Sequence, residues 1–401
     1  MTEFHQTKLG DMLTFQRGFD ITKSEQNEGT VPIVSSSGIS SYHNKAKVKG
    51  PGVVIGRKGT LGTVHFLKED FWPHDTTLWI KDFKGNCPRF LSYFMPALKL
   101  ENFDVGAANP TLNRNHVHGI KVVFPRKRKL QERIAAILSA YDELIETNQR
   151  RIALLEKLAE QIYREWFVRL RFPGHEKVKK IKGVPEGWRV AELRELAKVN
   201  PSSISRQNKP ENILYVDISS VSTNRIEGIT PYAFNDAPGR ARRRVEHGDV
   251  IWSSVRPANR AYSLIFDPPE NLIVSTGFAV IRPNKKTPFT FLFFAVTSNS
   301  FVDQMTAVAK GAAYPATSFD DFEKAKLLVP TDGLLSGFHD VAEPLFRQKH
   351  LLQEQNTHLT RTRDLLLPRL ISGKLSVEDL DIQFPPGMEE GRDRSPQRSG
   401  E

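Results

Sequence analysis

Residues 129–168 read KLQERIAAILSAYDELIETNQRRIALLEKLAEQIYREWFV and contain neither glycine nor proline. A run of this length exceeds the usual globular helix, so the stretch predicts one long helix. Its apolar residues recur in sevens and form a stripe wider than the seam of a two-stranded coiled coil. We therefore expect the helix to contact more than one neighbour. The seam positions are Ile134, Tyr141, Asn148, Leu155 and Ile162.

A second long helix is predicted at about 337–367, ended by Pro368. Polar residues such as Asn148 and Gln355 interrupt the two seams, a pattern that can fix register and partner. The first helix would be about 60 Å long, more than one turn of DNA at ~34–36 Å. Taken alone, the pair could equally be a hairpin that only stabilises or dimerises the protein. The second seam consists of Phe338, Leu345, Leu352, Leu359 and Leu366.

One long pattern of elements occurs twice in the chain. Each copy has a short opening segment, then a strand that leaves a turn, then two further strands. A polar loop centred on Pro110 or Pro315 follows, and then a closing strand and a long helix. The matched strands are expected at 52–57, 61–67, 76–80 and 120–124 in the first copy and at 248–253, 262–266, 277–281 and 325–329 in the second.

Strands rich in Val, Ile, Phe and Thr and broken by Gly and Pro favour an α/β (α+β) fold of mainly β character. The sequence therefore predicts two pseudo-repeated, mainly β globules separated by two long antiparallel coiled-coil helices. The expected boundaries are 1–126 for the first globule, 127–172 for the first helix, 173–331 for the second globule, 332–378 for the second helix and 379–401 for a disordered tail.

Charge and cysteine usage narrow the class of protein. Lys and Arg outnumber Asp and Glu by 57 to 46, which gives a formal charge of +11 and favours a polyanionic partner such as nucleic acid. Cys87 is the only cysteine, so an intrachain disulfide is impossible. Neither a signal peptide nor a stretch near the ~20 apolar residues of a membrane span is visible, so we expect a cytoplasmic protein.

At this point the chain resembles the specificity subunits of type I restriction–modification enzymes, over about residues 5–378. The most specific part of the likeness is the run LLLPRLISGKL at 365–375, which is similar to the end of their second spacer helix. The other segments that carry it are Gly59-Thr60-Leu61-Gly62, Asn109-Pro110-Thr111-Leu112, Phe124-Pro125, Gln131-Glu132-Arg133-Ile134-Ala135 and Pro185-Glu186-Gly187-Trp188. The second copy departs from the pattern, because Arg256-Pro257-Ala258-Asn259 stands where the first copy has Gly-Thr-Leu-Gly.

The resemblance implies a non-catalytic DNA-recognition subunit. Each globule would be a target-recognition domain that reads one half of a split site in double-stranded DNA, and the helices would set the gap. The helices would also present surfaces to DNA adenine methyltransferase subunits, expected to be two, and the complex would recruit a motor–nuclease subunit.

Basic clusters supply affinity for phosphates, and polar loop residues read bases. Among side chains that read bases, Arg pairs well with guanine and Asn with adenine in the major groove. The alternative for each candidate is a solvated surface residue. In the first copy the candidates are Ser36, Tyr42, His43, Asn44, Lys45, Lys47, Arg57, Lys58, Thr60 and His74. In the second copy they are Arg240, Arg242, Arg243, Arg244, Arg256, Asn259 and Arg260.

The sequence yields no catalytic residues, no metal ligands and no cofactor. The segment Asp267-Pro268-Pro269-Glu270 resembles an amino-methyltransferase loop, but Glu270 replaces the stacking aromatic residue, and a turn is the simpler interpretation. Asp75 and Asp82 have only a loose nuclease-like spacing. The alternatives are a stand-alone methyltransferase or nuclease, and a coiled-coil scaffold without DNA preference.

Overall fold

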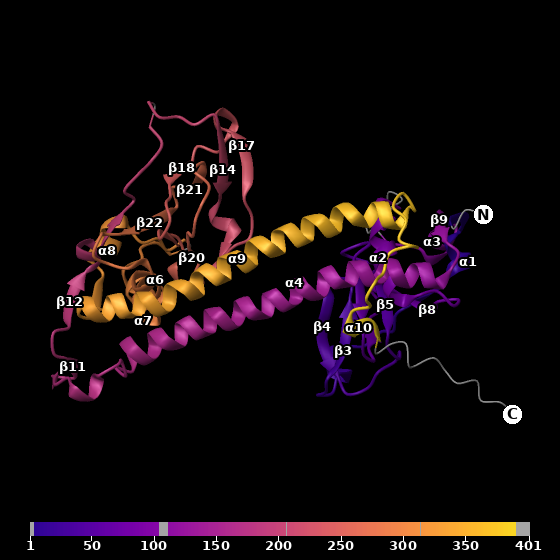
Figure 1. Cartoon of the computed structure of the whole chain (residues 1–401), viewed down its shortest axis with the longest axis horizontal. Coiled ribbons are helices and arrows are strands. Elements are labelled where there is room, and N and C mark those ends of the chain that lie inside the picture. The colour runs from indigo at the N-terminus through magenta and orange to yellow at the C-terminus, as the bar shows by residue number, and fades with distance from the viewer. Residues whose placement is uncertain (1–3, 104–110, 206, 313, 390–401) are drawn as a thin grey trace. The chain divides into compact units, whose positions relative to one another are not determined.

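The computed structural model describes residues 4–103, 111–205, 207–312 and 314–389. The chain forms two compact units, one built from 1–149 and 354–401 and the other from 150–353. Two long helices, α4 (Arg128–Tyr163) and α9 (Asp332–Ile371), each contribute residues to both units (Figure 1). None of the helices in the described ranges is long and apolar enough to cross a membrane.

The first unit contains a four-stranded sheet of order β2-β8-β5-β6, a three-stranded sheet β4-β3-β7 and a two-stranded sheet β1-β9. In the three-stranded sheet, β3 runs antiparallel to β4 and parallel to β7. The strands are β1 (Phe4–Lys8), β2 (Thr14–Arg17), β3 (Val31–Ser35), β4 (Gly38–His43), β5 (Gly52–Gly56), β6 (Val64–Leu67), β7 (Trp72–Pro73), β8 (Thr77–Asp82) and β9 (Lys121–Pro125). The shorter helices are α1 (Leu9–Met12), α2 (Pro88–Ala97), α3 (Arg114–His118) and α10 (Pro386–Glu389).

The second unit repeats this arrangement. Its sheets have the orders β13-β22-β19-β20, β17-β14-β21-β18 and β12-β23, and β14 is again parallel to one neighbour, β21, and antiparallel to the other, β17. The main strands are β12 (Arg189–Glu192), β13 (Ala197–Val199), β14 (Asn212–Val216), β17 (Thr230–Ala233), β18 (Ala241–Arg244), β19 (Val250–Ser253), β20 (Tyr262–Leu264), β21 (Leu272–Ser275), β22 (Phe278–Pro283) and β23 (Lys326–Val329). The shorter strands are β10 (Lys180–Ile181), β11 (Val184–Pro185), β15 (Val221–Ser222) and β16 (Arg225–Ile226), and the shorter helices are α5 (Leu193–Leu196), α6 (Phe289–Thr297), α7 (Asn299–Val308) and α8 (Phe319–Lys324). The internal repeat predicted from the sequence is therefore confirmed.

Each unit has a core to which both long helices contribute. In the first unit, Phe90 and Phe124 pack in one buried cluster with Ile134 of α4 and Leu370 of α9. In the second, Trp252 and Phe322 lie in a cluster with Tyr163 of α4 and Phe338 of α9. The apolar seams of the helices thus complete the globules as well as contacting each other, which explains why the stripe on α4 is wide.

The two long helices are antiparallel where they meet. In the first unit Asn148 of α4 contacts Gln355 of α9, and six residues earlier Asp142 pairs with Arg363, eight residues later. In the second unit Glu156 pairs with Lys349 at 2.6 Å. Residue numbers rise on one helix as they fall on the other, which confirms the predicted antiparallel pair.

The second long helix differs from its predicted limits. It begins at Asp332, because burial of Leu335 and Phe338 rewards the extra turn and the Thr331 carbonyl accepts from the amides of Leu334 and Leu335. The prediction that Pro368 ends it is wrong. Inside a helix, proline removes one i→i−4 hydrogen bond and crowds the carbonyl of residue i−4. The chain nevertheless stays helical to Ile371, and burial of Leu370 and Ile371 offsets that cost. The first long helix ends at Tyr163 and continues as a π-helical turn, Arg164–Val168.

Part of the predicted disordered tail has an assigned position. The backbone carbonyl of Leu380 accepts a hydrogen bond from the guanidinium of Arg133. Ile382 and Met388 pack on the core of the first unit. Residues 390–401 lie outside the described ranges.

Candidate nucleic-acid interface

A loop follows the same strand in each unit and carries several candidates for DNA contact. In the first unit it joins β5 to β6, with Lys58 and Thr60 exposed and Arg57 half-buried. Gly59 and Gly62 have φ values of +76° and +73°, a region that glycine enters at little cost, and the sharp turn of this loop depends on it. In consequence, Lys58 and Thr60 are presented on a tight, pre-formed turn.

The equivalent loop of the second unit joins β19 to β20 and includes a 3₁₀ turn, Pro257–Asn259. Arg256 and Arg260 flank this turn with φ values of +51° and +55°. Asn259 and Arg256 are exposed, and the Arg256 guanidinium lies over the ring of Tyr314, 4.6 Å from its centroid. Tyr314 is 69% exposed and was missed by the sequence analysis, although it directly precedes the quoted Pro315.

A second loop braces each of these turns through matched backbone bonds. The amide of Leu112 donates to the Arg57 carbonyl at 3.0 Å, and the amide of Thr317 donates to the Ser254 carbonyl at 2.8 Å. These loops are the Pro-centred segments that the sequence aligned with each other. Asn109 and Pro110, which also carried the resemblance, lie outside the described residues.

A charged cluster surrounds the predicted base-reading residue His74. Arg17 pairs with the carboxylate of Asp75 at 2.8 Å, and Nδ1 of His74 lies 3.1 Å from the same carboxylate. Partial burial, together with the nearby charge of Arg17, lowers the pKa of Arg57. Potential ligand atoms of Asp20, His74 and Asp75 also lie within 4.8 Å of one another, so this corner offers a cation some oxygen and nitrogen atoms. Arg17 already compensates Asp75, which weakens the case for a metal.

Two candidates from the first copy are buried and have structural roles. His43 is 5% exposed, accepts from the amide of Asn27 at 3.0 Å and packs edge-on against Trp72. Ser36 is 8% exposed, and its carbonyl accepts from the hydroxyl of Thr63. Neither side chain has a surface to offer to DNA in this conformation.

The remaining candidates of this region are exposed on β4 and in the segment that follows it. Tyr42, Asn44 and Lys45 are accessible, and the ammonium of Lys47 lies over Trp72, 5.0 Å from the ring centroid. Lys47 belongs to a segment whose backbone bonds to Phe71 beside β7.

The basic run of the second copy lies at the sheet edge beside β21, the strand that corresponds to β7. Arg242, Arg243 and Arg244 belong to β18, which pairs antiparallel with β21. Arg242 stacks over Phe234 at 5.0 Å, Arg243 stacks over Phe319 at 5.0 Å, and Arg244 donates to the Asn208 carbonyl at 2.8 Å. Burial lowers the pKa of Arg243. These three arginines are half-buried and engaged internally, whereas Arg240 is exposed.

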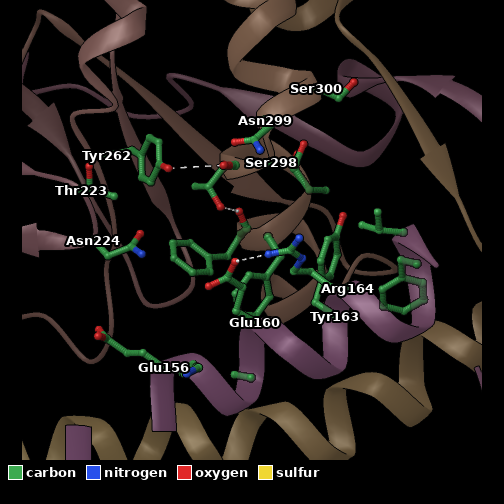
Figure 2. Close-up of a pocket in the computed structure, with 18 of the residues that line it drawn as sticks. Glu156, Glu160, Tyr163, Arg164, Thr223, Asn224, Tyr262, Ser298, Asn299 and Ser300 are labelled. Carbon is green, nitrogen blue, oxygen red and sulfur yellow. Dashed lines mark hydrogen bonds and ion pairs between the residues drawn. The ribbon is translucent and has the colours of Figure 1, made fainter. Parts of the chain in front are cut away.

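Arg260 lines a cavity of about 820 Å³ in the second unit. The cavity lies between α4, the α6–α7 junction and β20, as Figure 2 shows with Tyr163, Tyr262 and Ser298. Tyr163 packs against the rings of Phe294 and Phe338. Burial raises the pKa of its hydroxyl. The side chain of Arg260 therefore faces the helices of its own unit.

The predicted seam residues all avoid full exposure. Asn148, Ile134, Phe338 and Leu352 are buried. The half-buried seam residues are Tyr141, Leu155, Ile162, Leu345, Leu359 and Leu366. The role of these positions as the seam between the two helices stays a prediction.

The segments that resembled catalytic motifs form turns. Asp75 precedes β8 and Asp82 ends it, so about six residues of extended strand, roughly 20 Å, separate the two carboxylates. The amide of Leu272 donates to the Pro269 carbonyl at 2.9 Å, and the Asp267 carboxylate pairs with His247 at 2.7 Å. The described atoms at these two places favour turns over reaction centres.

Comparison with known proteins identifies the family. The chain matches the type I restriction modification DNA specificity domain over residues 1–157 and again over 185–333, one match for each copy of the repeat. It therefore belongs to the family of type I restriction–modification DNA specificity proteins. The resemblance inferred from the sequence is confirmed.

Individual relatives agree with this family. The chain is 24% identical over 305 residues to the type I restriction enzyme MjaIX specificity subunit of Methanocaldococcus jannaschii, covering 70% of this chain and 66% of that one. It is 26% identical over 189 residues to the HindI specificity subunit of Haemophilus influenzae, covering 46% and 39% of the two chains. The matched parts thus span less than two thirds of these relatives.

A solved structure shares the fold. The S subunit of a type I restriction–modification system from M. genitalium aligns with a TM-score of 0.64 at 17% identity, over 92% of this chain and 96% of that one. This likeness shows that the two chains share a fold.

Proposed function

We propose that this chain is the DNA sequence-specificity subunit of a type I restriction–modification complex. One observation carries the proposal: the same sheet order and the same pair of braced loops occur twice, with cationic side chains on both loops. Two equivalent DNA-binding units on one chain suit a site in double-stranded DNA that has two specific halves. The family match to both copies supports the same role.

In this function the exposed loop residues contact DNA and the buried ones hold the loops. Arg57, whose guanidinium is half-buried, and the exposed Lys58 suit phosphate contacts. Ser36, His43 and Arg260 leave the proposed interface because their side chains face the protein. The proposed contact set is Tyr42, Asn44, Lys45, Lys47, Arg57, Lys58, Thr60, His74, Arg240, Arg256 and Asn259, with Arg242, Arg243 and Arg244 as a supporting basic edge.

The partners follow from the same proposal. In this proposal adenine methyltransferase subunits supply methylation to the complex, two of them if each copy of the repeat receives one. A motor–nuclease subunit supplies restriction. Exposed apolar residues on the long helices, Leu154 and Leu158 on α4 and Leu351 on α9, support docking of such proteins along the helix pair.

The test is genome-wide adenine methylation in cells that express the neighbouring methyltransferase with and without this chain. The proposal expects a split motif with a fixed gap only when the chain is present. Identical methylation in both cultures would contradict it. Exchange of residues 1–125 for another recognition domain should then change one half of the motif and leave the other half intact.

The two alternatives make different predictions. A stand-alone methyltransferase would methylate DNA when the chain is purified alone with the methyl donor. A coiled-coil scaffold without DNA preference would give no sequence-dependent binding at any salt concentration. Binding of the purified complex to one bipartite site, measured against a scrambled duplex, distinguishes both from the proposed function.

A further inference from the structure

The loops that follow β5 and β19 can be aligned residue by residue from their backbone hydrogen bonds. The amide of Gly56 donates to the Thr63 carbonyl at 2.8 Å, and the amide of Ser253 donates to the Ala261 carbonyl at 2.8 Å. These bonds fix the two ends of each loop. The second loop contains one residue more than the first between them.

Counted from these ends, two arginines occupy the positions of two glycines. Arg256 follows Ser253 by three residues, as Gly59 follows Gly56, and Arg260 directly precedes Ala261, as Gly62 precedes Thr63. All four residues have positive φ: +76° and +73° for the glycines and +51° and +55° for the arginines. A side chain in this region crowds the backbone, so the second loop keeps two strained residues where glycine would fit. Strain of this kind is concentrated at functional sites.

The two arginine side chains have different surroundings. Arg260 lines the cavity beside α4. Arg256 is exposed, and its guanidinium carbon lies 4.6 Å from the ring centroid of the exposed Tyr314. The amide of Arg256 also donates to the Pro315 carbonyl at 2.7 Å. Arg256 is therefore held at its backbone and at its guanidinium while it faces solvent.

Such an arrangement suits a base better than a phosphate. A guanidinium carries a planar fork of N–H donors, and an aromatic ring beside it restricts how that fork can turn. The fork matches the O6 and N7 acceptors that guanine presents in the major groove. A phosphate contact needs only a cation on a flexible stem, so it would not require either the strained backbone or the ring.

We propose that Arg256 is a specificity-determining residue that reads a guanine in the half-site of the second recognition domain, and that Tyr314 is its positioning residue. The inference rests on the proposed function. It adds to that function one base that is recognised, the residue Arg256 that recognises it and the residue Tyr314 that orients Arg256.

The test uses the full chain assembled with its methyltransferase and a duplex library randomised at each position of the wild-type motif. Arg256→Gly restores the residue found at Gly59, so the fold should be kept and the melting temperature should equal or exceed that of the wild type. We expect the preference for one guanine in one half-site to fall about 10- to 100-fold, with the other half unchanged. Arg260→Gly is the matched control, since it relieves the same strain and should keep the motif.

Tyr314 is tested through its ring and its hydroxyl separately. Tyr314→Ala frees the guanidinium and should weaken the preference for the same guanine. Tyr314→Phe keeps the stacked ring and should retain that preference. A purely structural role for Tyr314 would lower the melting temperature without changing the preference at a single base.

The outcomes separate this inference from the function on which it rests. A wild-type complex without any split motif would overturn the proposed function and the inference together. A split motif that Arg256→Gly leaves unchanged would overturn the inference alone. Equal weakening of methylation on all sequences would also overturn it, because that result indicates a phosphate contact.

Discussion

The side-chain amide of Asn148 on α4 donates to Oε1 of Gln355 on α9 at 3.0 Å, from a side chain without exposed surface. The same amide donates to Oδ1 of Asn356 at 3.0 Å. Among the described atoms, Oδ1 of Asn148 finds no partner, and a buried unpaired acceptor costs stability. An apolar seam could slide by a turn at small cost, whereas the NH₂ group of Asn148 finds its two acceptors in one register. Asn148 therefore trades stability for a defined alignment of the two helices.

Replacement of this amide should separate stability from alignment. We expect Asn148→Leu to raise the free energy of unfolding by about 1–2 kcal/mol, because the unpaired acceptor disappears. The gap of the methylation motif should become heterogeneous, since alternative registers gain access. Chemical denaturation and motif sequencing measure the two effects. Thr147→Leu, at an exposed position of the same helix, is the control and should change neither. A destabilised Asn148→Leu variant with a single gap would contradict this role.

A buried ion pair stabilises the second unit. Asp249 is fully buried and accepts from Nε and Nη2 of Arg282, both at 2.8 Å, while Glu246 pairs with the same guanidinium at 2.6 Å. Burial raises the pKa of Asp249, and the hydrogen bonds from Arg282 oppose that rise. Asp249→Ala should destabilise the unit by about 3 kcal/mol, because a partly buried arginine loses its main partner.

The double variant Asp249→Leu/Arg282→Met removes both charges and should lie within about 1 kcal/mol of the wild type. Urea denaturation followed by tryptophan fluorescence checks both variants. Lys324→Ala breaks an exposed pair with Asp320 and should leave the free energy of unfolding close to that of the wild type. If the double variant is as unstable as the single one, the ion pair stabilises the unit more than apolar side chains of similar volume do.

Features that depend on neighbouring or repeated residues could be predicted from the sequence. Apolar spacing pointed to positions on the long helices such as Ile134 and Leu352, which are buried. Loop order aligned Thr111 with Ala316, and these two residues form equivalent bridges to Lys58 and Val255. Apolar spacing is a local pattern and loop order is a repeated one, so both are visible in the sequence alone.

The identity of the surface residues depended on contacts distant in sequence. His43 looked like a polar loop residue, yet it is buried against Trp72, which lies far along the chain. Arg242 and Arg243 looked like a free basic run, yet β18 places them against Phe234 and Phe319. Periodicity gives no information on which aromatic ring a distant strand brings to an arginine, and for the same reason Tyr314 was missed.

Salt dependence should report the phosphate contacts of the first loop. Lys58 is exposed on the turn after β5, and neutralising one phosphate contributes about 0.9 to the slope of log K against log salt. Lys58→Ala should therefore reduce the slope of DNA binding by about one and weaken all sequences equally. Lys121→Ala, the same charge change in β9, should keep the slope. Loss of preference for a particular base in Lys58→Ala would instead indicate base reading.

The length of the helix pair should set the gap between half-sites. The pairs Asp142–Arg363 and Glu156–Lys349 imply that 150–156 of α4 lie opposite 349–355 of α9. Removing both heptads together keeps the seam in phase and shortens each helix by about 10 Å, or roughly three base pairs of DNA. The motif should keep both halves with a gap about three base pairs shorter. Removing only 150–156 gives the two helices unequal lengths, which displaces Asn148 from its partners by one heptad, and should abolish assembly or methylation. Size-exclusion chromatography of the complex and motif sequencing measure these results. An unchanged gap with full activity after the paired deletion would mean that the helices join the recognition domains without measuring the distance between their targets.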